Sequence, residues 1–199
     1  MNQARSIAES SSNIFLEKRL LSIIMENLIP TSNPYLFLHR GDITRLKCDA
    51  IVNAANSTLL GGGGVDGAIH SAAGPELLAE CRTLHGCRTG EAKLTRGYNL
   101  PAKFVIHTVG PIYSGAPSDP VDLAACYTNS LAVAVQHDIH SIAFPAISTG
   151  VYHYPPDDAA KVVIAAVRRW LSANPSYRIK IIFSCFDQKT YDIYTSLLK

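Results

Sequence analysis

Short apolar runs alternate along the chain with segments whose apolar residues recur every three or four positions. Apolar runs between turn signals are typical of buried strands, and the longer periodic segments indicate helices. The predicted strands cover residues 35–40, 50–52, 92–98, 103–109, 141–147 and 178–184. The predicted helices cover residues 66–73, 75–85, 119–137, 155–173 and 187–198. Strands that alternate with helices predict an α/β domain with a mixed sheet between helical layers.

The first part of the chain has a different pattern. Residues 14–29 carry apolar side chains at helical spacing and end at Pro30, which predicts an amphipathic helix packed on the main domain. We therefore divide the chain into an N-terminal helical extension, residues 1–34, and one domain, residues 35–199, and expect about the first twelve residues to be poorly ordered. Glu17 and Glu26 interrupt the apolar run and no small-residue cleavage site follows, so we expect no secretory signal. A mitochondrial transit peptide stays open as an alternative.

Composition and charge limit the class of protein and the partners that we expect. A hydrophobic content of 47% and a charged content of 17% are typical of a globular domain. The net charge is only +2, so we do not expect nucleic acid as the main partner. Five scattered cysteines indicate a reduced intracellular protein, which we place in the cytoplasm, with nucleus and mitochondrion open. No apolar run reaches transmembrane length, so we expect no membrane partner, and we expect a monomer.

Four consecutive glycines, Gly61 to Gly64, separate a predicted strand from a predicted helix. Glycine is costly to order, so a fold keeps such a run where side chains would obstruct something. Backbone N–H groups next to a helix N-terminus bind anions, so the run predicts a phosphate cradle; a flexible surface loop is the alternative. The segment from Ser148 to Tyr152 also follows a strand and is a second candidate cradle, or else an ordinary connection. Two such loops at strand ends would clamp a diphosphate.

Several polar and aromatic residues near these loops have two interpretations each. Asp42 is a turn residue or an acceptor for the amino group of a base, and Phe186 belongs to the core or stacks on a base. Asp66 is a helix N-cap or orients a water molecule beside the cradle. Asn53 and Asn56 form turns or bind hydroxyl groups.

Two other motifs are weak. Gly62, Gly64 and Gly67 match the dinucleotide fingerprint formally, but eight residues separate Val52 from Gly61, where that fingerprint needs a tight turn. Cys81, His85 and Cys87 have no common zinc-finger spacing, so we interpret them as ordinary residues of a helix end.

Taken together, these motifs resemble the macrodomain family, in particular its MacroD-type branch of ADP-ribosyl hydrolases and O-acetyl-ADP-ribose deacetylases. The resemblance covers roughly residues 35–199. Its motifs are residues 41–44 (GDIT), 49–56 (DAIVNAAN), 61–70 (GGGGVDGAIH), 108–111 (TVGP), 147–152 (ISTGVY) and 185–187 (CFD). The resemblance implies a three-layer α/β/α fold that binds ADP-ribose in a cleft at the strand ends.

The resemblance also implies roles for individual residues. Asp42 and the N–H of Ile43 would bind adenine, and Phe186 would lie against it. The diphosphate would lie between two loops, one made of Gly62, Gly63, Gly64 and Val65 and the other of Ser148, Thr149, Gly150 and Val151. Asn56 would bind the distal ribose, Tyr152 would fix its pose, and Asp66 would orient the attacking water with help from a substrate phosphate.

The implied reaction is removal of mono-ADP-ribose from acidic side chains of proteins, together with deacetylation of O-acetyl-ADP-ribose. ADP-ribosylated proteins and that small molecule are the expected partners. We expect no cofactor and no metal, because the loop lacks the cysteine and histidine of the zinc-containing macrodomains. A non-catalytic ADP-ribose reader, a phosphatase acting on ADP-ribose 1″-phosphate and an RNA-linked role are the alternatives.

Overall fold

The computed structural model describes residues 28–199, which form a seven-stranded sheet in the order β1-β2-β7-β6-β3-β5-β4. The strands are β1 (Leu28–Pro30), β2 (Leu36–Arg40), β3 (Ala50–Ala54), β4 (Ala92–Arg96), β5 (Phe104–Thr108), β6 (Ser141–Phe144) and β7 (Lys180–Cys185). The inner strands β2, β7, β6, β3 and β5 are parallel, whereas the edge strands β1 and β4 are antiparallel to their neighbours. The predicted mixed sheet is confirmed.

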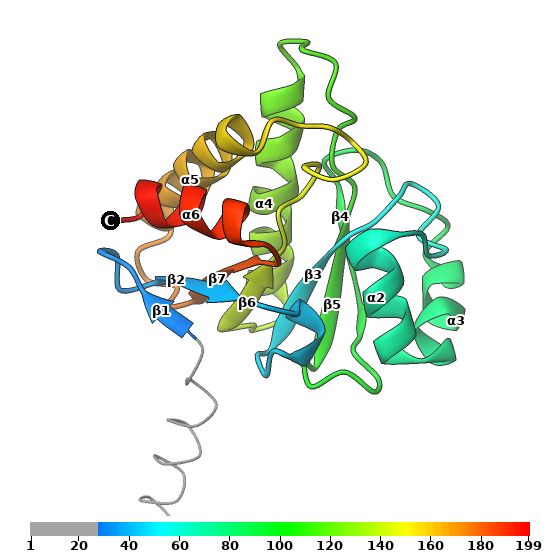
Figure 1. Ribbon diagram of the computed structural model, residues 1–199. Coiled ribbons are helices and arrows are strands. Elements are labelled where there is room, and N and C mark those ends of the chain that lie inside the picture. Colours follow the sequence, from blue (N-terminus) through cyan, green and yellow to red (C-terminus); the bar gives the residue numbers. More distant parts are fainter. Residues whose placement is uncertain (1–27) are drawn as a thin grey trace, which may run out of the picture.

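Helices cover both faces of this sheet (Figure 1). The helices are α2 (Gly64–Ala73), α3 (Pro75–Thr83), α4 (Asp119–Gln136), α5 (Pro156–Ala173) and α6 (Gln188–Leu197), and a short 3-10 helix, η1, spans Ile43–Arg45. On one face of the sheet, α2 contacts β3 and α3 contacts β4. Helices α4 and α6 cover the other face, and α5 packs against both of them. The three-layer α/β/α arrangement is therefore confirmed. None of the helices described is long and apolar enough to cross a membrane.

Alternate residues of the central strands serve two separate cores. Ile51 and Val105 pack with α2 and α3, whereas Val52 and Ile106 pack with the helices of the opposite face. Successive side chains of a strand point to opposite faces, and both faces are covered here, so the strands are almost continuously apolar. A polar residue inside one of these strands is therefore buried whichever face it points to.

The helices begin where local chemistry favours it. Helix α5 starts with Pro156, which has no N–H, at a position where an N–H would have no partner within the helix. Asp157 and Asp158 follow, and their negative charges are favoured at the positive end of the helix dipole. Helix α6 starts after Asp187, whose carboxylate accepts a hydrogen bond from the N–H of Thr190 at 2.8 Å. The predicted helix boundaries agree with the structure to within about two residues because such signals mark them.

The N-terminal prediction needs a correction. Leu28 and Ile29 were expected at the end of a helix in a separate extension, but they belong to β1, which pairs with β2. Two adjacent apolar residues fit either structure, and pairing with β2 satisfies their backbone groups. Pro30 is tolerated there because β1 is an edge strand. The rest of the predicted helix, residues 14–27, lies outside the described residues.

One carboxylate holds the segment before α4 in place. Asp119 is buried and accepts hydrogen bonds from the N–H groups of Ser114 and Gly115, both at 2.8 Å, and Ala116 at 3.2 Å. These bonds, chiefly the one from Ser114, hold the pKa of Asp119 below its usual range. The residue before Ser114 is Tyr113, and its N–H donates to the carbonyl of Tyr152 at 2.9 Å. Asp119 thereby supports the loop that follows β6.

We predict that residues 28–34 stabilise the domain. A chain that begins at residue 35 should lose about 2 kcal/mol of unfolding free energy relative to one that begins at residue 28, because it lacks the β1 pairing and the two bonds from Ser32 to the carbonyl of Leu198. Denaturant unfolding of the two chains measures the difference. Equal midpoints would show that β1 adds nothing.

We also predict that Asp119→Asn lowers the thermal midpoint at pH 7 by a few degrees, because an amide cannot accept all three N–H bonds as a carboxylate does. The folded-state pKa lies below the unfolded one, so the stabilisation is complete above the unfolded value of about 4 and is lost as the pH falls further. The gap between variant and wild type should therefore narrow below about pH 4. Asp122→Asn, in the same helical turn, is the matched control, and an equal shift in both variants would contradict the prediction.

Candidate functional site

A cleft of about 560 Å³ lies at the carboxyl ends of the parallel strands. Its walls come from residues 41–43 after β2, residue 186 after β7, residues 145–152 after β6 and residues 55–56 after β3. Ligands of open α/β sheets bind in this position, outside the carboxyl ends of the strands. The topology thus gathers segments that are far apart in the sequence around one cleft.

Every residue assigned to the site from the sequence lines this cleft. These residues are Asp42, Ile43, Asn56, Gly62, Gly63, Gly64, Val65, Asp66, Ser148, Thr149, Gly150, Val151, Tyr152 and Phe186. The two candidate cradles contribute most of them, so the structure brings both loops to the same cavity.

The glycine loop leaves room for a ligand at its centre. A methyl group on Gly63 or Gly64 would meet nothing within 4 Å, whereas one on Gly62 would lie 3.0 Å from the Oδ2 atom of Asp66. Helix α2 begins at Gly64, so its first backbone N–H groups are at the cleft. A helix N-terminus with open space beside it suits an anion such as a phosphate.

The second loop is held by its own hydrogen bonds. Ser148 has a φ of 66°, in the left-handed region that non-glycine residues seldom adopt, and its carbonyl accepts a bond from the N–H of Tyr154 at 3.0 Å. The hydroxyl of Thr149 donates to the carbonyl of Ala146 at 2.8 Å. The hydroxyl of Ser148 is buried and has no hydrogen-bond partner within residues 28–199. A strained, hydrogen-bonded turn with a free donor is ready to receive a ligand.

Asp42 and Phe186 occupy one end of the cleft. One carboxylate oxygen of Asp42 caps η1 by accepting bonds from the N–H and hydroxyl of Thr44, at 2.9 and 2.7 Å, so its turn role is confirmed. Phe186 is 82% exposed, so its assignment to the core is excluded. An exposed aromatic ring beside a carboxylate offers a stacking face and an acceptor to a base.

The two asparagines differ. Asn56 forms a turn: its Oδ1 atom accepts a bond from the N–H of Thr58 at 3.1 Å, and its amide donates to the carbonyl of Gly61 at 2.8 Å. Asn53 is completely buried and neither forms a turn nor lines the cleft. Both interpretations offered for Asn53 from the sequence are therefore wrong.

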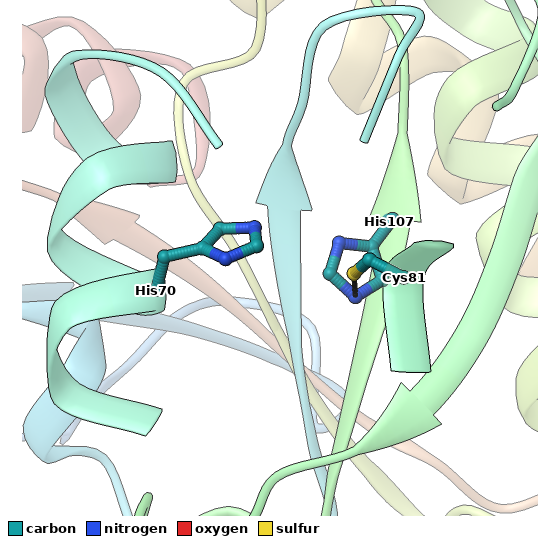
Figure 2. Close-up of side chains that lie close together, drawn as sticks. All are labelled: His70, Cys81 and His107. Carbon is teal, nitrogen blue, oxygen red and sulfur yellow. Dashed lines mark hydrogen bonds between the residues drawn. The ribbon is translucent and has the colours of Figure 1, made fainter. Parts of the chain in front are cut away.

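Cys81 does not combine with His85 and Cys87. In the part of the chain that the structure describes, it lies in a group with His70 and His107, whose ligand atoms are within 4.8 Å of one another (Figure 2). Both ring nitrogens of His107 have other protein partners, Asn53 at 3.1 Å and Thr95 at 2.9 Å. Burial raises the pKa of the Cys81 thiol to about 11. We assign no metal to this group.

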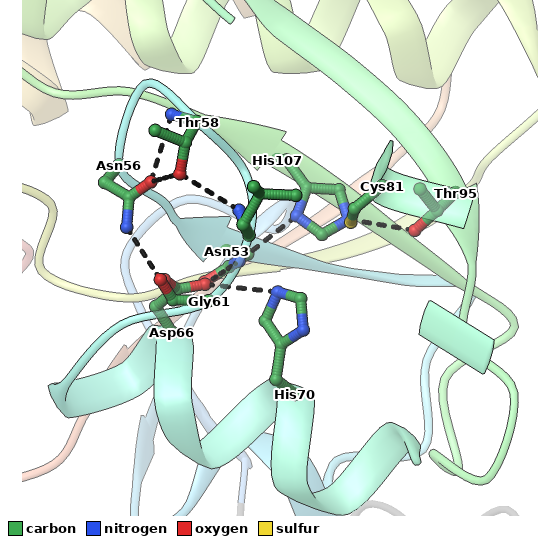
Figure 3. A network of polar contacts seen from close by, with 10 residues as sticks. Asn53, Asn56, Thr58, Gly61, Asp66, His70, Cys81, Thr95 and His107 are labelled. Carbon is green, nitrogen blue, oxygen red and sulfur yellow. Dashed lines mark hydrogen bonds and ion pairs between the residues drawn. The ribbon is translucent and has the colours of Figure 1, made fainter. Parts of the chain in front are cut away.

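Asp66 forms the floor of the cleft and is not an N-cap. It is the third residue of α2, whose N-cap is Gly63, and it is 3% exposed. Its Oδ1 atom accepts a bond from the amide of Asn53 at 2.7 Å and lies 3.5 Å from the Nε2 atom of His70 (Figure 3). Its Oδ2 atom is buried and has no hydrogen-bond partner among the residues that the structure describes. A fixed carboxylate with one free oxygen can orient or deprotonate a water molecule.

The residues around this carboxylate were not predicted from the sequence. His70, Thr95 and His107 were assigned no role, yet they belong to the same polar network (Figure 3). Two signals were present in the sequence: His70 follows Asp66 by four positions on one helix face, and His107 interrupts the apolar run of β5. The contacts between them depend on strand register, which the sequence alone does not specify.

This chain is similar to known proteins of one family. The model of the macro domain family, "Macro domain", matches residues 52–163. The chain is 59% identical over 160 residues to the macro domain-containing protein RSc0334 of Ralstonia nicotianae, covering 80% of this chain and 91% of that protein. It is 54% identical over 168 residues to the ADP-ribose glycohydrolase MACROD1 of Mus musculus, covering 83% of this chain. It spans 52% of that relative, and 38% of the ADP-ribose glycohydrolase MACROD2 of Xenopus laevis, to which it is 56% identical over 158 residues.

Solved structures show the same fold. The Trypanosoma brucei macrodomain in complex with ADP-ribose has a TM-score of 0.81 and 43% sequence identity, over 87% of this chain and 74% of that one. The Oceanobacillus iheyensis macrodomain with ADP has a TM-score of 0.78 and 41% identity, over 85% of this chain and 92% of that one. From the family match, these relatives and the shared fold, we conclude that the chain belongs to the macro domain family.

Proposed function

We propose that this protein binds ADP-ribose and hydrolyses the bond that joins mono-ADP-ribose to an acidic side chain of a protein, and that it also deacetylates O-acetyl-ADP-ribose. The observation that carries the proposal is Asp66, a buried carboxylate that lines the cleft and has one oxygen without a hydrogen-bond partner in the described part of the chain. Relatives named ADP-ribose glycohydrolases and a macrodomain solved with ADP-ribose support the substrate class.

The nucleotide would lie along the cleft with its base at the end formed by Asp42, Ile43 and Phe186. Its diphosphate would lie between the glycine loop and residues 148–151, where backbone N–H groups supply donors without adding a formal charge. The distal ribose would then reach Asn56, Asp66 and Tyr152. In this orientation the base meets the exposed ring of Phe186, and the distal ribose meets the buried carboxylate of Asp66.

The chemistry uses binding energy from remote groups. Adenine and diphosphate contacts would hold the distal ribose against one water molecule, which removes much of the entropic cost of attack. Asp66 would take up or share a proton of that water through its free Oδ2 atom, with help from a phosphate oxygen of the substrate. Attack at the anomeric carbon or at the acyl carbon would release ADP-ribose and restore the carboxylate of the target protein.

A non-catalytic reader is the main competing function. A reader must bind ADP-ribose but does not need a buried carboxylate that is held in place and left with a free oxygen. Burial of such a group is costly unless it is bonded, and Asp66 retains one unpartnered atom despite that cost. The arrangement therefore favours the hydrolase.

We predict that Asp66→Ala lowers the rate of ADP-ribose release from an ADP-ribosylated protein by about 10²- to 10⁴-fold, because it removes the general base. The dissociation constant for ADP-ribose, measured by calorimetry, should stay within about twofold, since adenine and diphosphate supply most of the binding. Asp158→Ala, which removes an exposed carboxylate on α5, is the control. Hydrolysis at the wild-type rate by the Asp66 variant would refute the role given to this residue.

We predict that Phe186→Ala weakens ADP-ribose binding by about 1–3 kcal/mol, the usual value of one aromatic–base stack. The free energy of unfolding should not change, because the ring is 82% exposed and contributes little to the core. Phe186→Tyr keeps the aromatic face and should bind like the wild type. Equal affinities for the alanine variant and the wild type would show that the base lies elsewhere.

A further inference from the structure

Asn53 and His107 are two polar residues in positions where the sheet elsewhere holds apolar ones. They are register partners on β3 and β5, two residues beyond the pair formed by Ile51 and Val105. Alternation places them on the same face as those two residues, toward α2 and α3. Both are completely buried, and buried polar groups are costly unless hydrogen-bonded. Their presence in this core calls for an explanation.

The contacts determine the direction of each hydrogen bond. The Nδ2 atom of Asn53 lies 2.7 Å from the Oδ1 atom of Asp66 and 3.1 Å from the Nδ1 atom of His107. The opposite amide orientation would place two acceptors, the amide oxygen and the carboxylate, against each other. An amide nitrogen only donates, so the Nδ1 atom of His107 must accept and carries no proton.

The other ring nitrogen completes the chain of bonds. With Nδ1 unprotonated, a neutral His107 carries its proton on Nε2 and donates it to the hydroxyl of Thr95, 2.9 Å away. Burial, together with the nearby His70, lowers the pKa of His107 to about 3, so the ring stays neutral at physiological pH. Thr95, His107 and Asn53 thus form one buried chain that ends at Asp66 (Figure 3).

We propose that His107 is a positioning residue for hydrolysis: its Nε2-protonated ring accepts from Asn53 and so fixes the amide that holds the Asp66 carboxylate. The proposal rests on the proposed hydrolase function and adds the groups that make Asp66 effective. His107 does not line the cleft, so it acts only through its neighbours. Small displacements of a catalytic group lower the rate strongly, whereas binding of the remote adenine and diphosphate does not depend on them.

The matched variants are His107→Asn and His107→Gln. The amide of asparagine reaches about the position of Nδ1 and can still accept from Asn53, whereas that of glutamine reaches the position of Nε2 and contacts only Thr95. Both replace the ring with a smaller neutral amide. We expect kcat to fall about 10- to 100-fold for His107→Gln and to stay within about threefold of wild type for His107→Asn. The dissociation constant for ADP-ribose should be unchanged in both.

Thr95→Val is a second, milder variant that leaves the ring in place. It removes the oxygen partner of the Nε2 proton and leaves only the Cys81 sulfur, 3.7 Å away. The ring can then move its proton to Nδ1, which would turn the Asn53 amide away from Asp66. We expect a lower kcat with unchanged ADP-ribose affinity. This variant tests the proposal even if the substitutions at 107 fail to fold.

Combination with Asp66→Ala separates positioning from general loss of structure. If His107 acts through Asp66, then His107→Gln will not lower the residual rate of the Asp66→Ala protein any further. Nitrogen NMR of the histidines in the wild-type protein should show an unprotonated Nδ1 and a protonated Nε2 for His107.

Three results would overturn the proposal. The first is a protonated Nδ1 in His107, and the second is a wild-type kcat for both His107→Gln and Thr95→Val. The third is a His107→Gln substitution that lowers the hydrolysis rate by the same factor in the wild-type and Asp66→Ala proteins. A wild-type protein that binds ADP-ribose but releases none from any substrate would instead refute the proposed function, and the NMR result would still decide the hydrogen-bond chain.

Discussion

A parallel sheet with helices on both faces leaves only the ends of its strands open to a ligand. In this protein the inner strands are parallel, and the segments that follow β2, β3, β6 and β7 meet at one cleft. Their backbones supply N–H groups, and the glycines of one segment keep the approach open. The site is thus a consequence of the topology, and its position does not depend on any single side chain.

The proposed chemistry depends on a carboxylate that the fold places in the core. Asp66 would be costly to bury alone, but it lies in the first turn of α2 and accepts a hydrogen bond from the amide of Asn53. Only one of its oxygens is used in this way, and the other is buried without a hydrogen-bond partner among residues 28–199. In the proposed reaction, the contacts that make this buried carboxylate tolerable would also orient it toward a water molecule.

Long and strongly patterned elements could be predicted from the sequence. The strands around Val52 and Ile182 and the helix that begins at Pro156 lie where the apolar pattern placed them, because burial on both faces or a clear start signal leaves few alternatives. The cleft residues could be assigned because their motifs lie between a strand and the following helix and resemble those of macrodomains. Strand β1 could not be predicted, since Leu28 and Ile29 fit the end of a helix equally well and only pairing with β2 decides between the two structures.

The polar network was missed for a different reason. Asn53 and His107 are far apart in sequence, and their contact depends on the register between β3 and β5. An asparagine after an apolar run is usually a turn residue, so the local pattern gave the wrong interpretation of Asn53. Cys81 was similarly considered with its sequence neighbours, whereas it lies beside His107 from another element.

A crystal structure of this protein with ADP-ribose tests the central claim most directly. The account predicts adenine at Asp42 and Phe186, the diphosphate between residues 62–65 and 148–151, and the distal ribose beside Asp66, with room for one water molecule between them. A nucleotide bound in the reverse orientation, with its distal ribose at Phe186, or bound outside this cleft would contradict it.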